Sequence, residues 1–391
     1  MVIERTNALP PPSPEEREAS RALARAIAEE ITATGGWIPF SRYMELALYS
    51  PGLGYYGGGA QKFGAAGDFI TAPELTPLFG QSLAAQIAEL FAQTSPVILE
   101  VGAGSGHLAA DLLASLAALG CAPERYSILE LSGELRARQK ARIAERTPDL
   151  VERVQWLDSL PNAFDGVVIG NEVLDAMPVE LAVWREEAIL QRGVRVEGDR
   201  FNWEDRPAQG LLAREAEKLA VTPPVGGEYV SEIGLVAQAW IAEWAQRLAR
   251  GALLLIDYGY PRQEYYLPTR SSGTLSCYRL HRHHDEPLLW PGLSDITAFV
   301  DFTAIAEAGF AAGLDVLGYA DQANFLINCG LLDRLAERGP VDSADYLRAA
   351  RAAQSLIAPH DMGEAFKVIA LGRGIRSPLR GFQRGDRLHT L

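Results

Sequence analysis

Residues 97–107 read VILEVGAGSGH, and this stretch decides how the chain is expected to fold. A compact apolar strand pattern, Val97–Val101, leads into three glycines at alternate positions, and an apolar helix pattern follows from Leu108 to Leu119. Glycines between a strand and a helix permit positive φ angles and close approach of a ligand to the backbone, while the helix N-terminus offers free N–H groups. We therefore expect a ligand-binding loop at the carboxyl end of this strand.

Strand and helix patterns continue to alternate beyond this loop. Further strand patterns are Tyr126–Leu131, Val154–Leu157, Val167–Gly170, Ala252–Ile256, Asp315–Tyr319 and Phe366–Leu371, separated by helix patterns such as Gly133–Glu145, Leu235–Arg250, Phe302–Ala312 and Ala344–Leu356. This alternation is typical of βαβ units and a parallel sheet. The sequence predicts an α/β fold with an open, doubly wound sheet of about seven strands and an antiparallel edge strand.

The regions outside the alternation define the expected domains. Residues 1–95 are predicted to be an N-terminal arm and helical cap, with residues 1–14 disordered or extended. Residues 96–375 form the core, with insertions at about 179–234 and 321–360, and residues 376–391 form a tail. Within the first insertion, apolar residues at nearly alternate positions between Leu181 and Trp203 predict a β-hairpin or meander with turns at Gly193 and Gly198.

Composition excludes several classes of protein. The chain has 391 residues, 48% of them hydrophobic, and a formal net charge of −14, which disfavours duplex nucleic acid as the main partner. Three cysteines without a CxxC pair exclude a disulfide scaffold. No apolar run approaches the roughly 18–20 residues of a membrane helix. The N-terminus lacks a leader pattern, so we expect no membrane insertion and a cytoplasmic protein.

The glycine loop favours S-adenosylmethionine over a nucleotide. It lacks the lysine of a mononucleotide P-loop, and Gly102, Gly104 and Gly106 fall one residue short of the dinucleotide spacing. Glu100, two residues before the first glycine, would repel a pyrophosphate but not the cationic methionine moiety of S-adenosylmethionine. Glu130 ends the second strand, where a carboxylate accepts hydrogen bonds from ribose hydroxyls.

Asp158 ends the third strand, where class I methyltransferases commonly place an acidic or polar residue beside the adenine. The alternative is a tight turn with solvated acids. Because ligands bind at the carboxyl ends of strands in doubly wound sheets, we favour the cofactor site.

The fourth strand leads into residues 171–178, NEVLDAMP, which are candidates for the chemistry. Asn171 and Glu172 follow the strand directly. Glu172 and Asp175 are three residues apart and would share one face of a helical turn. Two carboxylates can hold a guanidinium by two nitrogens and leave the third able to attack a methyl group. The alternative, a capped turn with exposed acids, remains open on the residues alone.

Three further stretches are candidates for the site. Residues 67–74, GDFITAPE, could bring Asp68 to the amino group of the cofactor, although Thr71 as a helix cap is the simpler interpretation. Tyr258 and Tyr260 end the fifth strand and could stack on a planar acceptor, or lie in the core.

The segment with Cys277, His281, His283, His284 and Asp285 matches no standard zinc spacing. We therefore expect no metal there and assign His281 to a loop that contacts the acceptor.

Several stretches resemble the MidA family of class I S-adenosylmethionine-dependent methyltransferases, whose mitochondrial members are assembly factors for respiratory complex I. The matching stretches are YYGGGAQKFGAAGDFITAPELTPLFG, LEVGAGSGHLAADLL, VVIGNEVLDAMPV, LLLIDYGY, GTLSCYRLHRHH, DITAFVDF and MGEAFKVIALGRG, between about Pro39 and Arg373. The resemblance implies a Rossmann-like sheet with seven strands and symmetric ω-N dimethylation of arginine on a protein, a subunit of NADH dehydrogenase. It assigns the three loop glycines and Glu130 to the cofactor.

The same resemblance assigns Asn171, Glu172 and Asp175 to catalysis. Bacterial members often carry His where this chain has Phe299, which puts a general base at that position in doubt. Two hypotheses of different classes follow: an arginine methyltransferase, or a cofactor-binding assembly factor with little or no turnover. Within the enzyme class, a small-molecule acceptor is the alternative.

Overall fold

The computed structural model describes residues 9–57, 71–219, 221 and 223–391, and the predicted site residue Asp68 lies outside them. The chain forms two compact units. One, called here the hairpin unit, comprises Met1–Phe69, Asp175–Ala239 and Tyr260–Ala304; the other, the sheet unit, comprises Ile70–Leu174, Trp240–Gly259 and Ile305–Leu391. The helix at residues 77–91, which the sequence assigns to an N-terminal cap, belongs to the sheet unit.

The main sheet carries the predicted alternation. Among the described residues its strands follow the order β15-β16-β10-β5-β2-β3-β4. They are β2 (Val97–Val101), β3 (Arg125–Leu129), β4 (Val154–Leu157), β5 (Phe164–Asn171), β10 (Leu248–Tyr260), β15 (Asp315–Asp321) and β16 (Phe366–Arg373). The strands from β10 to β4 pair in parallel, whereas β16 pairs antiparallel with both neighbours. The antiparallel strand therefore lies one position in from the edge, and the prediction of an antiparallel edge strand was wrong.

Burial explains why β2 and β10 take the centre of this sheet. Ile98 and Leu99 are completely buried, as are Ala252 and its apolar successors along β10. Strands buried on both faces carry continuous apolar runs without polar alternation. The parallel order also brings the carboxyl ends of β2, β3, β4 and β5 to one edge of the sheet, where ligands bind in such folds.

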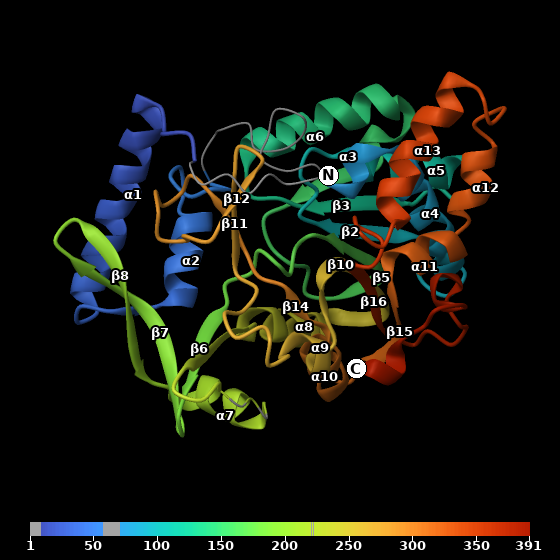
Figure 1. Ribbon diagram of the computed structural model, residues 1–391. Helices are drawn as coiled ribbons and strands as arrows, with labels where there is room; N and C mark the ends of the chain where they lie inside the picture. The colour runs from blue at the N-terminus through green and yellow to red at the C-terminus, as the bar shows by residue number, and fades with distance from the viewer. Residues whose placement is uncertain (1–8, 58–70, 220, 222) are drawn as a thin grey trace. The chain divides into compact units, whose positions relative to one another are not determined.

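Helices cover both faces of the sheet. They are α3 (Ala72–Leu75), α4 (Pro77–Phe91), α5 (His107–Ala118), α6 (Gly133–Arg146), α8 (Leu235–Arg247), α10 (Phe302–Ala311), α11 (Gln322–Asn328), α12 (Leu331–Ala336) and α13 (Ala344–Ile357), with short 3-10 turns η1 (Pro148–Arg153), η2 (Arg380–Phe382) and η3 (Leu388–Thr390). In Figure 1, α4, α5 and α11–α13 gather on one side of the strands and α8 and α10 on another. A Cβ on Gly309 of α10 would lie 3.0 Å from Leu371 of β16 and 3.5 Å from Ile241 of α8, so these elements are closely packed.

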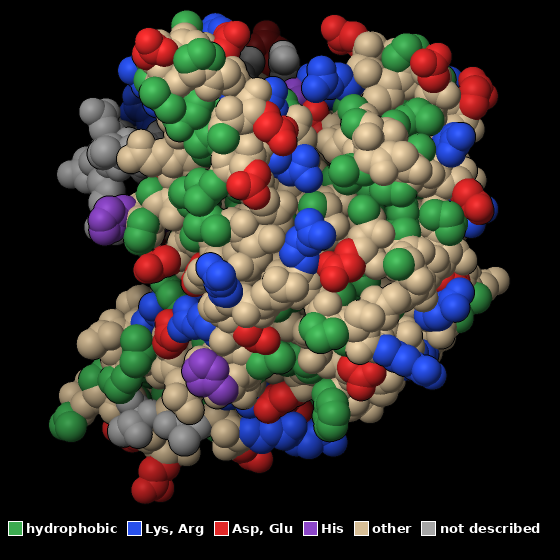
Figure 2. Space-filling model, turned by 90° about the vertical axis from the view of Figure 1, so that its right-hand side faces the viewer, with side chains coloured by type: hydrophobic (Ala, Val, Ile, Leu, Met, Phe, Trp, Pro, Cys, Tyr) green, Lys and Arg blue, Asp and Glu red, His purple; other side chains and the backbone are tan. Residues whose placement is uncertain are grey.

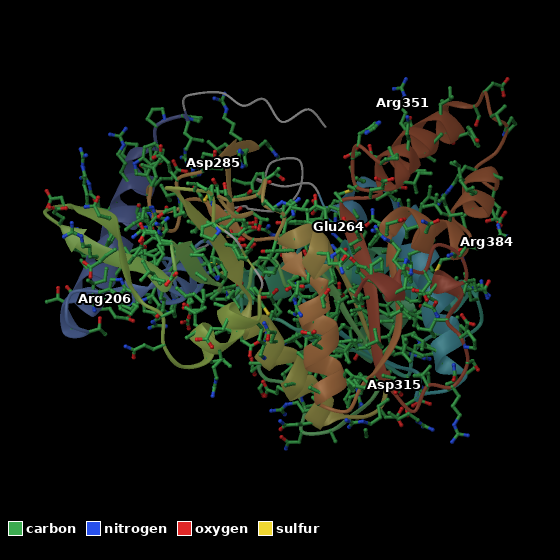
Figure 3. The ribbon with its side chains drawn as sticks, turned by 60° about the horizontal axis from the view of Figure 1, so that its bottom comes forward. Arg206, Glu264, Asp285, Asp315, Arg351 and Arg384 are labelled. Carbon is green, nitrogen blue, oxygen red and sulfur yellow. The ribbon has the colours of Figure 1, made fainter. Side chains whose placement is uncertain are left out.

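The hairpin unit is built on antiparallel strands. Its elements are α1 (Pro14–Ala33), β1 (Ile38–Pro39), α2 (Phe40–Tyr49), β6 (Glu180–Arg185), β7 (Ala188–Glu197), β8 (Arg200–Pro207), α7 (Gly210–Lys218), β9 (Glu228–Ile233), α9 (Arg262–Tyr265), β11 (Ser276–Arg279), β12 (Arg282–His284), β13 (Asp295–Thr297) and β14 (Val300–Asp301). A capping box between Ser13 and Glu16 begins α1. Arg206 on β8, labelled in Figure 3, places its guanidinium 4.8 Å from the ring centre of Trp37.

Gly193 does not form the predicted turn. It lies inside β7, where a Cβ would stand 2.3 Å from the carbonyl oxygen of Ile38 and 2.4 Å from the ring of Trp37. The absence of a side chain at Gly193 allows the segment with Trp37 and Ile38 to approach the strand closely, which is a common reason for glycine inside a strand. The hairpin turns at Glu186 and at Gly198 instead, both with positive φ.

Two surface properties follow from the described residues. None of their helices combines the length and the apolar character needed to cross a bilayer. On the face drawn in Figure 2, acidic and basic side chains are interspersed and hydrophobic side chains are scattered between them.

Candidate active site

The glycine loop has the backbone that the sequence predicts. Gly102, Gly104 and Gly106 have φ angles of 70°, 51° and 82°, in the left-handed region that side chains rarely adopt. Gly106 caps α5, and a Cβ there would lie 3.0 Å from Cα of Gln139. The loop therefore requires glycine both for conformation and for its close packing against α6.

Gln139 of α6 holds the loop and two strand ends together. Its fully buried amide Nε2 donates to the carbonyl of Gly104 (3.0 Å) and to the carboxylate of Glu130 (3.1 Å). Its Oε1 accepts from the indole N–H of Trp156 on β4 (2.8 Å). One side chain thus fixes the glycine loop relative to the carboxylate that the sequence assigns to ribose.

A second contact reaches the loop from α3. The Ser105 hydroxyl donates to Glu74 Oε1 (2.8 Å) and lies 2.8 Å from Nδ1 of His107. Burial lowers the pKa of His107, with a smaller effect of Arg142. Thr71 occupies the N-cap position of α3, as predicted, but its side chain makes no capping bond; the hydroxyl of Thr76 caps α4.

The ends of β3 and β4 lie side by side through a parallel pairing that includes Leu129 and Leu157. The Glu130 carboxylate accepts the Ser132 N–H at 2.9 Å, and the residue is half-buried. Asp158 accepts from Arg136 (2.6 Å), but its side chain is 86% exposed. Leu131, the residue after Glu130, is 77% exposed, an unusual position for a leucine.

Glu100 has a different environment from the one assumed in the sequence argument. It is 2% exposed, and its Oε2 accepts from the hydroxyl of Tyr126 at 2.7 Å. Burial raises the pKa of Glu100 to about 7, against the lowering effect of the Tyr126 hydrogen bond. At neutral pH this carboxyl carries only part of the negative charge that the argument against pyrophosphate requires.

The segment after β5 forms a turn and no helix. Glu172 has a φ of 54°, and residues 175–176 form a turn, so Glu172 and Asp175 do not share a helical face and that prediction was wrong. Asn171 donates from Nδ2 to Glu172 Oε1 (3.1 Å), while its buried Oδ1 has no hydrogen-bond partner among the described residues. Asp175 belongs to the hairpin unit, where its carbonyl accepts the Ala298 N–H at 3.0 Å.

The two tyrosines after β10 have separate surroundings. Tyr258 is buried against Phe366, with ring centres 5.4 Å apart at 74°, as in the core alternative. In the hairpin unit, Tyr260 lies between Phe299 (ring centres 5.6 Å apart) and the guanidinium of Arg270, 4.3 Å from its ring centre. Phe299 thus has a packing role that needs no acid–base chemistry.

His281 lies at the exposed turn between β11 and β12, with a φ of 59°. Its neighbours are paired otherwise: His283 lies 3.2 Å from Asp285, which is labelled in Figure 3, and His284 lies 3.0 Å from the Ser294 hydroxyl. Burial lowers the pKa of His284 to about 4. Across the described part of the chain, no group of three or more His, Cys, Asp or Glu side chains could hold a metal ion.

The residues around the glycine loop fit a nucleoside joined to an amino acid. Exposed Leu131 offers an apolar surface for a base, and Glu130 beside it can accept from hydroxyl groups. The N-terminus of α5, a helix of twelve residues, favours a carboxylate. The donor set therefore matches S-adenosylmethionine, whose nucleoside and carboxylate ends need these partners.

Comparison with known proteins decides the family. Residues 82–320 match the S-adenosyl-L-methionine-dependent methyltransferase family. The chain belongs to this family. A crystal structure of a relative from Burkholderia thailandensis, bound to S-adenosyl-homocysteine, is 50% identical to this methyltransferase, with a TM-score of 0.94, and covers 98% of this chain and 100% of its own.

Curated relatives of this methyltransferase carry a more specific name. The fly protein named protein arginine methyltransferase NDUFAF7 homolog, mitochondrial, is 27% identical over 95% of this chain and 90% of its own. The mouse protein arginine methyltransferase NDUFAF7, mitochondrial, is 29% identical over 92% of this chain and 86% of its own. The fold is that of class I methyltransferases, and S-adenosylmethionine is the cofactor.

Sequence reasoning missed two residues beside the candidate cofactor loop, Leu131 and Gln139. Leu131 could have been noticed as an apolar residue placed directly after Glu130. Gln139 gives no local signal, because its partners come from the glycine loop, β3 and β4. Residues 257–260 at the end of LLLIDYGY are predicted from the sequence to line the acceptor side, but only the structure shows which N–H groups the Asp257 carboxylate accepts.

Proposed function

We propose that this methyltransferase transfers methyl groups to arginine side chains of a protein, with symmetric ω-N dimethylation of an NADH dehydrogenase subunit as the reaction. The observation that carries the proposal is the pair Asn171–Glu172 at the carboxyl end of β5: a carboxylate held by a neighbouring amide, next to a buried amide oxygen that has no hydrogen-bond partner among the described residues. The names of the curated relatives support protein arginine as the acceptor.

S-adenosylmethionine, when bound, supplies the electrophilic methyl group. Gly102–Gly106, Glu130 and Asp158 are the residues proposed to hold it, with Leu131 against the adenine. A guanidinium is too weakly acidic to lose its proton before attack, so orientation and electrostatics must supply most of the catalysis.

Glu172 acts on the guanidinium in this proposal. Its carboxylate accepts N–H bonds from two nitrogens and draws the positive charge toward them, which leaves lone-pair density on the third. The amide oxygen of Asn171 can accept one further N–H. Asp175, the second acid of the segment, is proposed to support the grip on the guanidinium.

Replacement of Glu172 by Gln tests this role. The variant keeps the shape but loses the charge, so it should bind S-adenosylhomocysteine as tightly as the wild type and lose on the order of a hundredfold in kcat, or roughly 3 kcal/mol. Asp175→Asn should lose less. Isothermal calorimetry and single-turnover kinetics measure the two properties.

Mass spectrometry of NADH dehydrogenase subunits, from cells with and without the protein, tests the acceptor. The expected result is a dimethylated arginine that disappears without the protein and does not return with Glu172→Gln. If Glu172→Gln restores assembly of the enzyme without any methylation, the chain is a cofactor-binding assembly factor. Methylation of a small molecule alone would contradict the protein acceptor.

A further inference from the structure

The conformation of Glu172 requires an explanation. Among the described residues of the sheet unit, it is the one non-glycine residue with a positive φ, 54°. A left-handed conformation costs a non-glycine residue roughly 1–2 kcal/mol, and such strain persists only where the surroundings impose it. The side chain direction of a residue depends on its backbone, so whatever holds this φ also aims the Glu172 carboxylate.

Asp257 of β10 holds the segment that follows Glu172. Its Oδ2 accepts the N–H groups of Val173 (3.1 Å) and Leu174 (2.8 Å), and its Oδ1 accepts the N–H of Tyr258 (3.0 Å). The side chain is 1% exposed. A carboxylate in this position satisfies the two N–H groups that the sharp turn removes from the strand ladder.

The ladder itself fixes the other side of Glu172. The Glu172 N–H donates to the carbonyl of Ile256 at 2.9 Å, which extends the parallel pairing of β5 with β10 by one bond. Glu172 is therefore fixed on both sides: its own N–H bonds to Ile256, and the two residues that follow it bond to Asp257. Both anchors belong to one strand, and together they leave its φ little freedom.

We propose that Asp257 is the positioning residue of the acceptor site: it holds Glu172 in the left-handed conformation that presents its carboxylate to the guanidinium. The proposal rests on the proposed function of Glu172. Without the Asp257 acceptor, the N–H groups of Val173 and Leu174 lose their partner, and Glu172 relaxes to a right-handed φ that turns its carboxylate away.

A double-mutant cycle tests this coupling. Asp257→Ala, which removes both acceptor oxygens, Glu172→Gln and the double variant are assayed with S-adenosylmethionine and a synthetic peptide centred on the arginine that mass spectrometry identifies. Asp257→Ala should lower kcat by about tenfold or more, with affinity for S-adenosylhomocysteine within about twofold of the wild type. In the Glu172→Gln background the same substitution should cost less than about twofold, because there is no charge left to aim.

Asp165→Ala is the matched control. Asp165 accepts a backbone N–H, that of Ser95 (2.8 Å), and pairs with Arg250; it lies near the start of β5, at the opposite end of the strand from Asn171. This control should lose stability without loss of kcat. Equal losses from Asp257→Ala in both Glu172 backgrounds would overturn the proposal, because they indicate general destabilisation.

A crystal structure of Asp257→Ala gives a readout that does not depend on activity. The expected change is a negative φ at residue 172, and a retained positive φ would overturn the proposal even if kcat falls. If no arginine peptide is methylated, the proposed function fails, whereas this structure still decides what Asp257 does. If the first variant does not fold, kcat and the φ of residue 172 are measured instead in Asp257→Glu, which keeps the charge and moves the carboxylate.

Discussion

At the scale of single residues, Glu100 shows how burial changes the meaning of a motif. The sequence places an acid before the glycine loop but does not show that Tyr126 is its partner or that it is buried. A free carboxylate and a buried one therefore look identical in the motif. The electrostatic argument drawn from it was weaker than the pattern suggested, because the charge of a group depends on its surroundings.

The raised pKa of Glu100 makes a prediction about stability. The pKa of Glu100 is about 7 in the folded chain against an ordinary value of about 4.5, so between these values the unfolded chain releases a proton that the folded chain keeps. Stability should therefore fall as the pH rises through this window. Glu100→Gln stays neutral and should be more stable than the wild type at pH 8, by on the order of 3 kcal/mol at most, and nearly equal at pH 4.

Urea denaturation at several pH values measures this difference. Asp111→Asn is a useful comparison, since burial raises the pKa of Asp111 to about 6, so its effect should be smaller and end at a lower pH. A constant difference between Glu100→Gln and the wild type across the range would contradict the assignment.

Gln139, whose buried amide bonds to the glycine loop, gives a prediction about cofactor binding at the same scale. Gln139→Leu keeps the volume but leaves the Gly104 carbonyl and the Trp156 N–H without a partner. We expect a loss of about tenfold or more in affinity for S-adenosylhomocysteine, since each unpaired buried group costs about 1–3 kcal/mol. Calorimetry measures this affinity. Gln155→Leu is the control, because Gln155 is an exposed residue of β4 that bonds to Ser127. Reduced stability with unchanged affinity would limit Gln139 to a core role.

At the scale of elements, the sequence predicted what depends on local patterns. The strand β2 has the predicted bounds, Val97–Val101, and α5 and α6 begin within a residue of prediction, because apolar runs and caps act over a few residues. Gly193 was misread, since a glycine marks either a turn or a close approach, and only the position of Trp37 distinguishes them.

The prediction of a shared helical face in the segment after β5 was wrong for a related reason. The spacing of three residues between Glu172 and Asp175 suggests a helical face. Nothing local to this segment shows that Asp257, more than eighty positions later, accepts the N–H groups of the two residues between them, Val173 and Leu174. The turn is a product of the pairing between β5 and β10. Long-range hydrogen bonds of this kind decide the geometry of the candidate site, whereas its residue types could be predicted.

At the scale of the whole molecule, the division into two units gives a prediction about the cofactor. The glycine loop, Glu130 and Gln139 all belong to the sheet unit. A ligand that binds only the folded state stabilises it by about 2.7 kcal/mol at a hundred times its Kd. Saturating S-adenosylhomocysteine should therefore slow amide exchange at residues 97–107, 129–139 and 154–158, and leave β6–β9 of the hairpin unit nearly unchanged.

Hydrogen exchange measured by mass spectrometry, with NAD at the same concentration as the matched control, checks this expectation. NAD should give little protection, because the glycine spacing is one residue short of the dinucleotide loop. Equal protection by NAD would mean that the loop recognises an adenosine without regard to what it carries. Protection concentrated in β6–β9 would place the cofactor against the wrong unit. Protection confined to residues 97–107, 129–139 and 154–158 is the expected result, and each of these segments contains one partner of the buried Gln139 amide: Gly104, Glu130 and Trp156.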